Sequence, residues 1–311
     1  MRQKLPAWLL VVALVVGSVF LLAGGPGVFI PRSLAELWNL GHVPFFALLA
    51  HLLLRWPHWH RFSRRTIWLS VLLLVLALGI LVEYIQYGIG RDPDWHDVGR
   101  NLCGALLALV ITPGCSMPAP PWRHWLRGLM ALLILLVLTP FVTSSVDEIH
   151  ARTNFPELAN FSSPLELTRW GGHSERSRVS GFDQREGSQM KVVLLPARYS
   201  GAGLEYFPGD WRGYETLNFE LFLQGEEMLR VVFRVHDHVH RTVQPTYMHR
   251  DRLTYITFLE PGWNLIRIGL HEVRNAPRDR AMDMAQIVDA GFFAASLQSP
   301  RALYVDRVWL D

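Results

Sequence analysis

Two different patterns of apolar residues divide this chain. Up to about residue 146, apolar residues form long runs separated by short polar segments, whereas the rest carries short runs in which apolar and polar residues alternate. A helix rises about 1.5 Å per residue and needs roughly 20 apolar residues to cross the core of a bilayer. The first pattern therefore predicts membrane-spanning helices in five segments: 7–23, 39–56, 67–87, 98–112 and 125–142.

The second pattern predicts β-strands. Its runs are rich in β-branched and aromatic residues and are bounded by Gly, Pro and Asp, which is typical of an antiparallel sandwich. A domain of about 160 residues can bury a core of its own. A short linker is expected at 143–152, and strands are expected at 190–195, 203–207, 217–223, 229–235, 253–258, 264–270, 292–297 and 303–310.

Composition and charge agree with this division. Half of the residues are apolar, 18% are charged and the mean hydropathy is +0.17, as expected of a chain partly dissolved in lipid. Residues 1–146 carry 11 Lys and Arg against 5 Asp and Glu, whereas residues 147–311 carry 19 against 22. We therefore predict a multi-domain membrane protein, with an all-α transmembrane bundle at 1–146 followed by an all-β antiparallel jelly-roll sandwich at 147–311.

Basic loops predict the orientation. Lys and Arg lie before the first predicted span, between the second and third, and between the fourth and fifth, and short basic loops remain on the cytoplasmic side. Because this charge flanks apolar helices, it indicates orientation, and no nucleic-acid partner is expected. The predicted location is the inner (cytoplasmic) membrane, with a cytoplasmic N-terminus and an extracytoplasmic β domain.

Polar and ionisable residues gather at the ends of three predicted spans, all on the outer side. Such groups are costly near hydrocarbon, so they usually pair with one another, line a wet cavity or bind a ligand. Two interpretations stay open: hydrogen-bonded glue between helices, or a ligand site with Glu83 or Asp97 as base and Arg91 as phosphate clamp. This polar cluster comprises His42, Glu83, Gln86, Arg91, Asp97, Arg100 and Asn101.

The spacing of the polar cluster carries a family resemblance. It consists of Glu83-x-x-Gln86, then Arg91, then Asp97-x-x-x-Asn101-x-x-Gly104, with a Gly directly before His42. Over roughly residues 5–115 the chain resembles the VanZ-like family of small bacterial membrane proteins. It departs from the family at Asn39-Leu40, where an acidic and basic pair is usual, and in its added fifth span and large domain. The resemblance implies a membrane setting and an association with glycopeptide resistance, and it supplies no reaction.

The β half carries a second resemblance. Its landmarks are Phe161 to Trp170, Asp210-Trp211-Arg212-Gly213-Tyr214, Arg234-Val-His-Asp237, Pro261-Gly262-Trp263-Asn264 and Leu303-Tyr-Val-Asp306-Arg307-Val. These resemble jelly-roll modules of the galactose-binding-like, carbohydrate-binding type. The resemblance implies a sandwich fold and a glycan as partner.

Aromatic residues are the candidates for contact with sugar. Flat rings cover the apolar faces of pyranoses while nearby Asp and Arg take the hydroxyls, and core packing is the alternative for each ring, including Trp170 and Trp263. Trp211 and Tyr214 lie in a turn-like stretch and are expected to be exposed. They are the glycan-binding candidates, together with Asp210 and Arg212.

Three histidines have a spacing that could suggest a metal site. His236, His238 and His240 alternate along a predicted strand, which puts their side chains on one face. Three ligands in line converge poorly on a tetrahedral zinc centre. No metal and no cofactor is therefore predicted.

Two functions follow from these observations. The favoured one is a non-enzymatic cell-envelope membrane protein that contacts membrane lipid and binds a glycan, glycolipid or cell-wall precursor through its sandwich and its polar cluster. The alternative is an integral-membrane enzyme or translocation factor acting on a lipid-linked envelope precursor. No P-loop, nucleophile elbow or HExxH motif occurs, so any catalysis would rest on the polar cluster.

Overall fold

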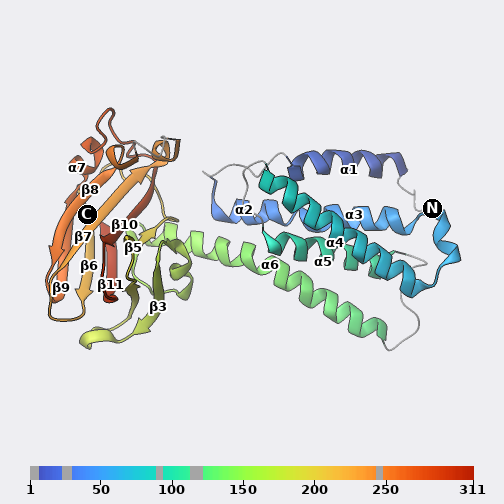
Figure 1. Ribbon diagram of the computed structural model, residues 1–311, viewed down its shortest axis with the longest axis horizontal. Coiled ribbons are helices and arrows are strands. Elements are labelled where there is room, and N and C mark those ends of the chain that lie inside the picture. The colour runs from blue at the N-terminus through green and yellow to red at the C-terminus, as the bar shows by residue number, and fades with distance from the viewer. Residues whose placement is uncertain (1–6, 23–29, 89–93, 113–121, 243–247) are drawn as a thin grey trace. The chain divides into compact units, whose positions relative to one another are not determined.

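The chain divides into two compact units, Met1–Ser145 and Val146–Asp311. The first, the helical unit, contains helices, and the second, the β unit, contains two packed sheets (Figure 1). The computed structural model describes residues 7–22, 30–88, 94–112, 122–242 and 248–311.

The long apolar runs of the helical unit form helices, as predicted. The expected segment 39–56 is divided, because one helix ends at Asn39 and the next begins at His42. The helices are α1 (Ala7–Leu22), α2 (Arg32–Asn39), α3 (His42–Leu54), α4 (Arg64–Gly88), α5 (Trp95–Ile111) and α6 (Trp122–Asn154), with a short 3-10 helix, η1 (Pro57–Arg61).

Among the residues that the structure describes, three helical stretches are long and apolar enough to cross a membrane. They are Arg32–Leu54, Arg64–Gly88 and His124–Asn154. The described helices α1 and α5 have 16 and 17 residues and fall below that length. The three stretches are candidates by length and composition, and the count of five spans stays a prediction.

Small residues bring α3 and α5 into close contact. A Cβ atom added to Gly104 would collide with the carbonyl oxygen of Val43, so the two backbones approach directly, as small residues allow in membrane helices. His42 lies 2.9 Å from Asn101 near one end of the pair, and His51 Nδ1 lies 2.8 Å from Thr112 Oγ1 near the other. The two helices therefore run parallel.

The last helix extends beyond its predicted end. α6 has 33 residues, so the expectation of a linker at 143–152 is wrong. That segment contains neither Gly nor Pro. The hydroxyls of Thr143 and Ser145 donate to the carbonyls of Thr139 and Phe141, one turn earlier. These hydroxyls are therefore satisfied within the helix itself, and the chain stays helical up to Asn154.

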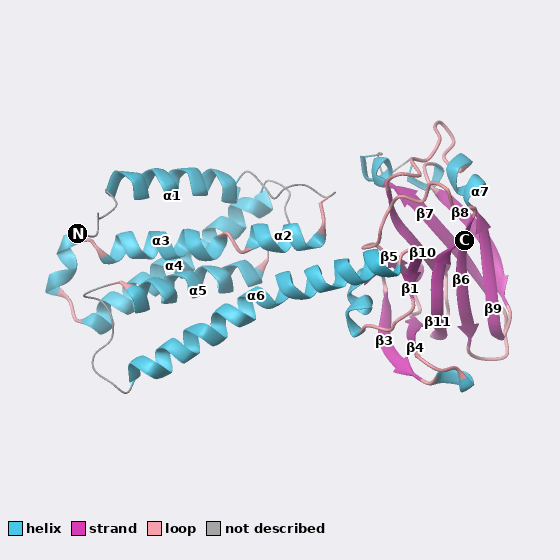
Figure 2. Cartoon of the chain, turned by 180° about the vertical axis from the view of Figure 1, so that it is seen from behind, coloured by secondary structure: helices cyan, strands magenta, loops and turns pink. Residues whose placement is uncertain are grey.

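The β unit is a sandwich of two antiparallel sheets (Figure 2). One sheet has the order β3-β4-β11-β6-β9, with β1 also pairing with β11, and the other has the order β2-β5-β10-β7-β8. The strands are β1 (Glu157–Ala159), β2 (Trp170–Gly171), β3 (Ser174–Ser180), β4 (Ser188–Leu194), β5 (Tyr199–Leu204), β6 (Thr216–Leu223), β7 (Leu229–Asp237), β8 (Leu253–Leu259), β9 (Gly262–Gly269), β10 (Ile287–Ala295) and β11 (Arg301–Leu310).

A glycine turn and several short helical segments join these strands. The chain passes from β8 in one sheet to β9 in the other through Pro261 and Gly262, and Gly262 has a φ of 93°, a conformation that glycine adopts without steric cost. The connecting segments are η2 (Pro164–Arg169), η3 (Phe182–Gln184), η4 (His238–Thr242), η5 (Met248–Arg250) and helix α7 (Leu270–Asn275).

Aromatic side chains from the two sheets meet in one core. The rings of Phe219 from β6 and Phe233 from β7 have centroids 5.0 Å apart, and Phe292 from β10 lies 6.0 Å from Phe233. All three are buried. In β6 and β7 the alternation of apolar and polar residues thus marks the face that packs into the core, as predicted.

Candidate functional site

The helical unit brings together the members of the polar cluster that the structure describes. His42 opens α3, Glu83 and Gln86 lie near the end of α4, and Asp97, Arg100 and Asn101 lie in the first turns of α5. All six are buried. Arg91, the seventh predicted member, lies outside the described residues.

A chain of contacts links α3 to α5. His42 uses both ring nitrogens: Nδ1 lies 2.9 Å from Asn101 Oδ1, and Nε2 lies 3.4 Å from Asp97 Oδ2. The other carboxylate oxygen of Asp97 accepts a hydrogen bond from Arg100 Nη1. The Asp97 carboxylate beside the His42 ring holds that ring in one orientation. A fixed orientation suits both a structural hydrogen bond and a general base.

Two carboxylates that the sequence analysis missed complete this arrangement. Arg100 Nη2 donates to Glu36 Oε2 in α2 at 3.2 Å, and Nη1 lies 3.4 Å from Asp94 Oδ2. Together with Asp97, three carboxylates surround one guanidinium group. Glu36 lies in a different helix, α2, so spacing gave no signal for it, and Asp94 is the N-cap of α5, directly before the first helical turn.

The α4 residues bind backbone groups. Glu83 Oε2 accepts a hydrogen bond from the amide of Asp94 at 2.9 Å, and Gln86 donates to the carbonyl of Leu21 at 3.0 Å. Within the part of the helical unit that the structure describes, Glu83 Oε1 and Asn101 Nδ2 are buried and have no hydrogen-bond partner. Arg100 is thus occupied by carboxylates, while two polar atoms of the cluster remain available to a ligand or a water molecule.

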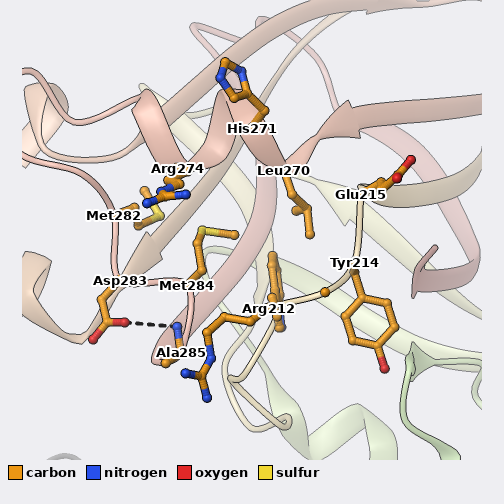
Figure 3. A pocket seen from close by; sticks show the side chains of 12 residues that line it. Arg212, Tyr214, Glu215, Leu270, His271, Arg274, Met282, Asp283, Met284 and Ala285 are labelled. Atoms are coloured by element: carbon orange, nitrogen blue, oxygen red, sulfur yellow. Dashed lines mark hydrogen bonds between the residues drawn. The ribbon is translucent and has the colours of Figure 1, made fainter.

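Three of the four glycan candidates, Trp211, Arg212 and Tyr214, line a cavity of about 730 Å³ in the β unit. Figure 3 shows the side chains of Leu270, Met282 and Met284 gathered in it, with Arg274 beside Met282 and His271 and Glu215 farther out. Asp283 accepts a hydrogen bond from the amide of Ala285 at 3.0 Å. We call this cavity the Trp211 pocket; it has an apolar floor and a charged rim.

Trp211 is 1% exposed, so the expectation that it is exposed is wrong. Its indole packs against Phe207 with ring centroids 5.5 Å apart, and Nε1 donates to the carbonyl of Pro208 at 3.2 Å. The ring belongs to the core and offers little area for stacking on a sugar. The sequence predicted exposure because turn residues surround Trp211. A ring buried beneath a turn has the same sequence pattern, so the pattern could not distinguish the two.

The other candidates in this pocket are already engaged. Tyr214 is half-buried and meets Phe155 edge to face at 5.4 Å. Arg212 binds Asp210 through two hydrogen bonds, of 2.8 and 2.7 Å, and both side chains are exposed. This pairing lowers the pKa of Asp210 to about 2. Their role in sugar binding stays a prediction.

The remaining tryptophan candidates are also covered. Trp170 is buried in the core. Trp263 is half-buried, carries the guanidinium of Arg185 3.6 Å above its ring, and donates from Nε1 to Asp183 Oδ2 at 2.6 Å. Protein groups therefore already occupy the ring faces that a sugar would need.

A second cavity, which the sequence analysis missed, lies on the face of the five-stranded sheet turned away from the core. We call it the sheet groove; its volume is about 400 Å³. Gly201 and Ala202 of β5 and Phe293 of β10 line it, and Tyr199 at the start of β5 is 55% exposed. The Tyr199 and Phe293 rings meet edge to face at 5.7 Å.

Two arginines line the same groove. Arg234 of β7 forms a two-point ion pair with Asp289 of β10, at 3.0 and 3.2 Å. Arg252 lies 5.9 Å from the centroid of the Phe293 ring. Burial, together with the positive charge of Arg234, lowers the pKa of Arg252 below its usual range. The groove thus combines an exposed aromatic ring, an uncovered backbone and hydrogen-bond donors.

The three histidines do not share a strand. β7 ends at Asp237, so His238 and His240 lie in η4, and no group of three or more His, Cys, Asp or Glu in the described part of the chain could hold a metal ion. Asp237 instead accepts two hydrogen bonds from Arg280, at 2.5 and 2.7 Å. Burial opposes its ionisation, but Arg280 and backbone amides outweigh that effect and lower the pKa of Asp237.

Comparisons with known proteins found similarity for about half of the chain. A family 11 carbohydrate-binding module from Clostridium thermocellum, solved with a β-1,3-1,4-mixed-linked tetrasaccharide, is 18% identical, covering 50% of this chain and 93% of that one with a TM-score of 0.37. An exo-β-agarase is 12% identical, covering 50% of this chain and 24% of that one with a TM-score of 0.39. These values identify no ligand of this chain.

No family model matches the chain, and no curated protein matches it. The resemblance to the VanZ-like family therefore stays a prediction.

Proposed function

We propose that the β unit binds glycan chains in the sheet groove and that the helical unit anchors it in a membrane. The observation that carries the proposal is the exposed Tyr199 ring beside a groove whose floor is glycine backbone and whose far side holds arginine donors. The apolar face of a sugar can lie on such a ring while its hydroxyls meet polar groups. A volume of about 400 Å³ lies within the range of small-ligand sites.

Glycines shape the sheet beneath the groove. A Cβ atom at Gly201 would collide with the backbone of Phe292, and one at Gly203 would lie 2.8 Å from Arg234 Nη2. At Gly201 the absence of a side chain lets β5 and β10 approach closely, and at Gly203 it leaves room for Arg234 and Asp289. The sheet beneath the groove therefore depends on specific residues of β5.

A glycan array probed with the full-length protein in detergent tests this proposal. We expect binding to a subset of envelope glycans and a loss of about tenfold in affinity for Tyr199→Ala, because one aromatic stacking contact contributes about that much. Tyr206→Ala is the matched control, since Tyr206 is also partly exposed but does not line the groove.

Arg212→Ala separates the two cavities of the β unit. If binding survives Tyr199→Ala but is lost with Arg212→Ala, the Trp211 pocket is the glycan site and the groove is not. If no glycan binds at all, the proposal fails. The buried Trp211 is unsuitable for this comparison, since its replacement by Ala would disrupt the core.

The membrane part of the proposal rests on the three long apolar stretches and on the basic loops between predicted spans. We expect a topology reporter fused after residue 147 to be active only outside the cytoplasm, and one fused at residue 60 to be active only inside. Reversed activities would overturn the proposed orientation.

The unpartnered atoms Glu83 Oε1 and Asn101 Nδ2 favour a second candidate function, a membrane-embedded site for an envelope precursor. Glu83→Gln keeps the shape of the side chain and removes its charge. Normal protein abundance with a lost envelope phenotype would support this role, whereas lost abundance would mean that the polar cluster is structural glue. Asp97→Asn, which disturbs the Arg100 contact, is the comparison for the structural effect.

A further inference from the structure

Charge is distributed unevenly around the sheet groove. Arg234 and Arg252 line it, and none of its lining residues is Asp or Glu. Asp289, the carboxylate beside Arg234, is 3% exposed and is bound by Arg234 at two points. A third arginine, Arg198, is exposed and lies 5.4 Å from the centroid of the Tyr199 ring. The lining residues of the groove therefore carry two guanidinium groups and no carboxylate.

Arg252 is the residue that makes this imbalance costly. Its Nε atom is buried and has no hydrogen-bond partner within the part of the β unit that the structure describes. Asp289 attracts Arg252 and Arg234 repels it, but the carboxylate oxygens of Asp289 are within hydrogen-bond distance of Arg234. Arg252 as a whole is half-buried, but a buried N–H donor is normally hydrogen-bonded, because leaving it unpaired is unfavourable.

We propose that the glycan bound in the sheet groove carries a carboxylate, that is, a uronic acid unit, and that Arg252 binds it. This inference rests on the proposed function and specifies its ligand. A guanidinium group presents two parallel N–H donors to a planar carboxylate, a match that an ammonium group lacks. The sugar ring then lies over Gly201 beside Tyr199, and its carboxylate points towards Arg252.

The test compares the acid and ester forms of the same sugar. Full-length protein in detergent is titrated with uronate-bearing oligosaccharides, oligogalacturonates included, and with the methyl ester of each, which removes the charge and keeps the backbone. We expect each bound acid to bind at least about tenfold more tightly than its ester, as for one charge-assisted hydrogen bond. The preference should weaken at high salt because it is electrostatic.

Three variants assign the preference to a residue. Arg252→Gln should bring the acid down to the affinity of the ester, and Arg252→Lys should keep part of the difference. Arg230→Gln is the control, since Arg230 is exposed on β7 and does not line the groove. This variant should keep the preference of the unaltered protein for the acid over the ester. Melting temperatures show whether each variant is folded, and the acid and ester comparison on the unaltered protein needs no variant.

The outcomes are distinguishable. If esters bind as tightly as acids, the assignment of a carboxylate to the ligand is wrong, while the proposal that the groove binds a glycan still holds. If sulfated galactan oligosaccharides bind as tightly as uronates, the groove selects negative charge and the assignment to a carboxylate is overturned. If no sugar of the panel binds, the proposed function itself fails.

Discussion

Single buried ion pairs define much of the β unit. Asp237 is fully buried and holds Arg280, the amide of Asp283 and the amide of His240. Arg280 in turn binds Asp251 at 2.8 Å. These contacts connect the end of β7 to the segment between α7 and β10, beside the point where Asp237 pairs with Ile287 of β10. A single carboxylate thus organises one end of the sandwich.

Acid should weaken this end of the β unit. The pKa of Asp237 is lowered in the folded state below its usual value near 3.8, so its contribution to stability is present above that value and is lost as the pH falls through the folded pKa. We expect Asp237→Asn to cost about 3 kcal/mol near pH 7, because a partner of a buried ion pair is removed, and to flatten the loss of stability below about pH 4.

Urea unfolding of the β unit between pH 3 and pH 7 measures both effects. Asp279→Asn is the matched control, since Asp279 lies in the same segment and is exposed. An equal acid dependence in the Asp237→Asn variant and the unaltered protein would contradict this assignment.

The elements show where sequence reasoning succeeds. The predicted strands of β4, β6, β7, β8, β9 and β11 lie close to the observed ones, since their apolar period reports burial directly. Each predicted helical segment overlaps an observed helix, but α6 extends well beyond its predicted end. β3 was not predicted. It has the sequence SERSRVS and lies at a sheet edge, and this sequence has no alternation of apolar and polar residues to detect. The prediction for β5 was displaced because two positions of one face, Gly201 and Gly203, carry no side chain and leave no alternation to detect.

The candidate sites follow the same division. The polar cluster was predictable because ionisable side chains are unfavourable beside long apolar segments, and both are visible in the sequence. Glu36 was missed, since its partner Arg100 is 64 residues away in the sequence. The sheet groove was missed for a related reason. Tyr199 lies in β5, Arg234 lies in β7 and Arg252 directly precedes β8, and only the strand order of the sheet places them together.

The contact between α3 and α5 can be tested with two glycines of one helix. Gly104→Ala should destabilise the helical unit by about 1–3 kcal/mol or more, because its Cβ would meet the backbone of α3 and force the helices apart. Gly99→Ala has open space around it and should stabilise α5 by up to about 1 kcal/mol through helix propensity. Thermal unfolding of the full chain in detergent should shift in opposite directions; equal shifts would contradict the close approach.

At the scale of the whole molecule, the boundary between the units falls inside α6. Asp147 of α6 is 3% exposed and binds Arg169, itself 2% exposed, through hydrogen bonds of 2.8 to 3.0 Å. The β unit therefore uses part of the last helix to neutralise a charge buried beside its own core.

A fragment that respects this ion pair should fold alone. We expect residues 143–311 to unfold cooperatively with a β-type circular dichroism spectrum, since the core of the sandwich lies within the β unit. A fragment of residues 150–311 lacks Asp147 and leaves Arg169 unpaired, which should cost about 3–5 kcal/mol. Chemical denaturation of both fragments measures the difference, and equal stabilities would mean that Arg169 finds another partner.

The position of β11 has a consequence for biosynthesis. This strand, Arg301–Leu310, lies between β4 and β6 and also pairs with β1. During translation, β4 and β6 leave the ribosome long before the strand that must separate them, so each presents an open edge while it waits. Open edges invite pairing with other chains. The nascent β unit is therefore a natural client for chaperones until residue 310 has emerged, and it completes its fold in one late step.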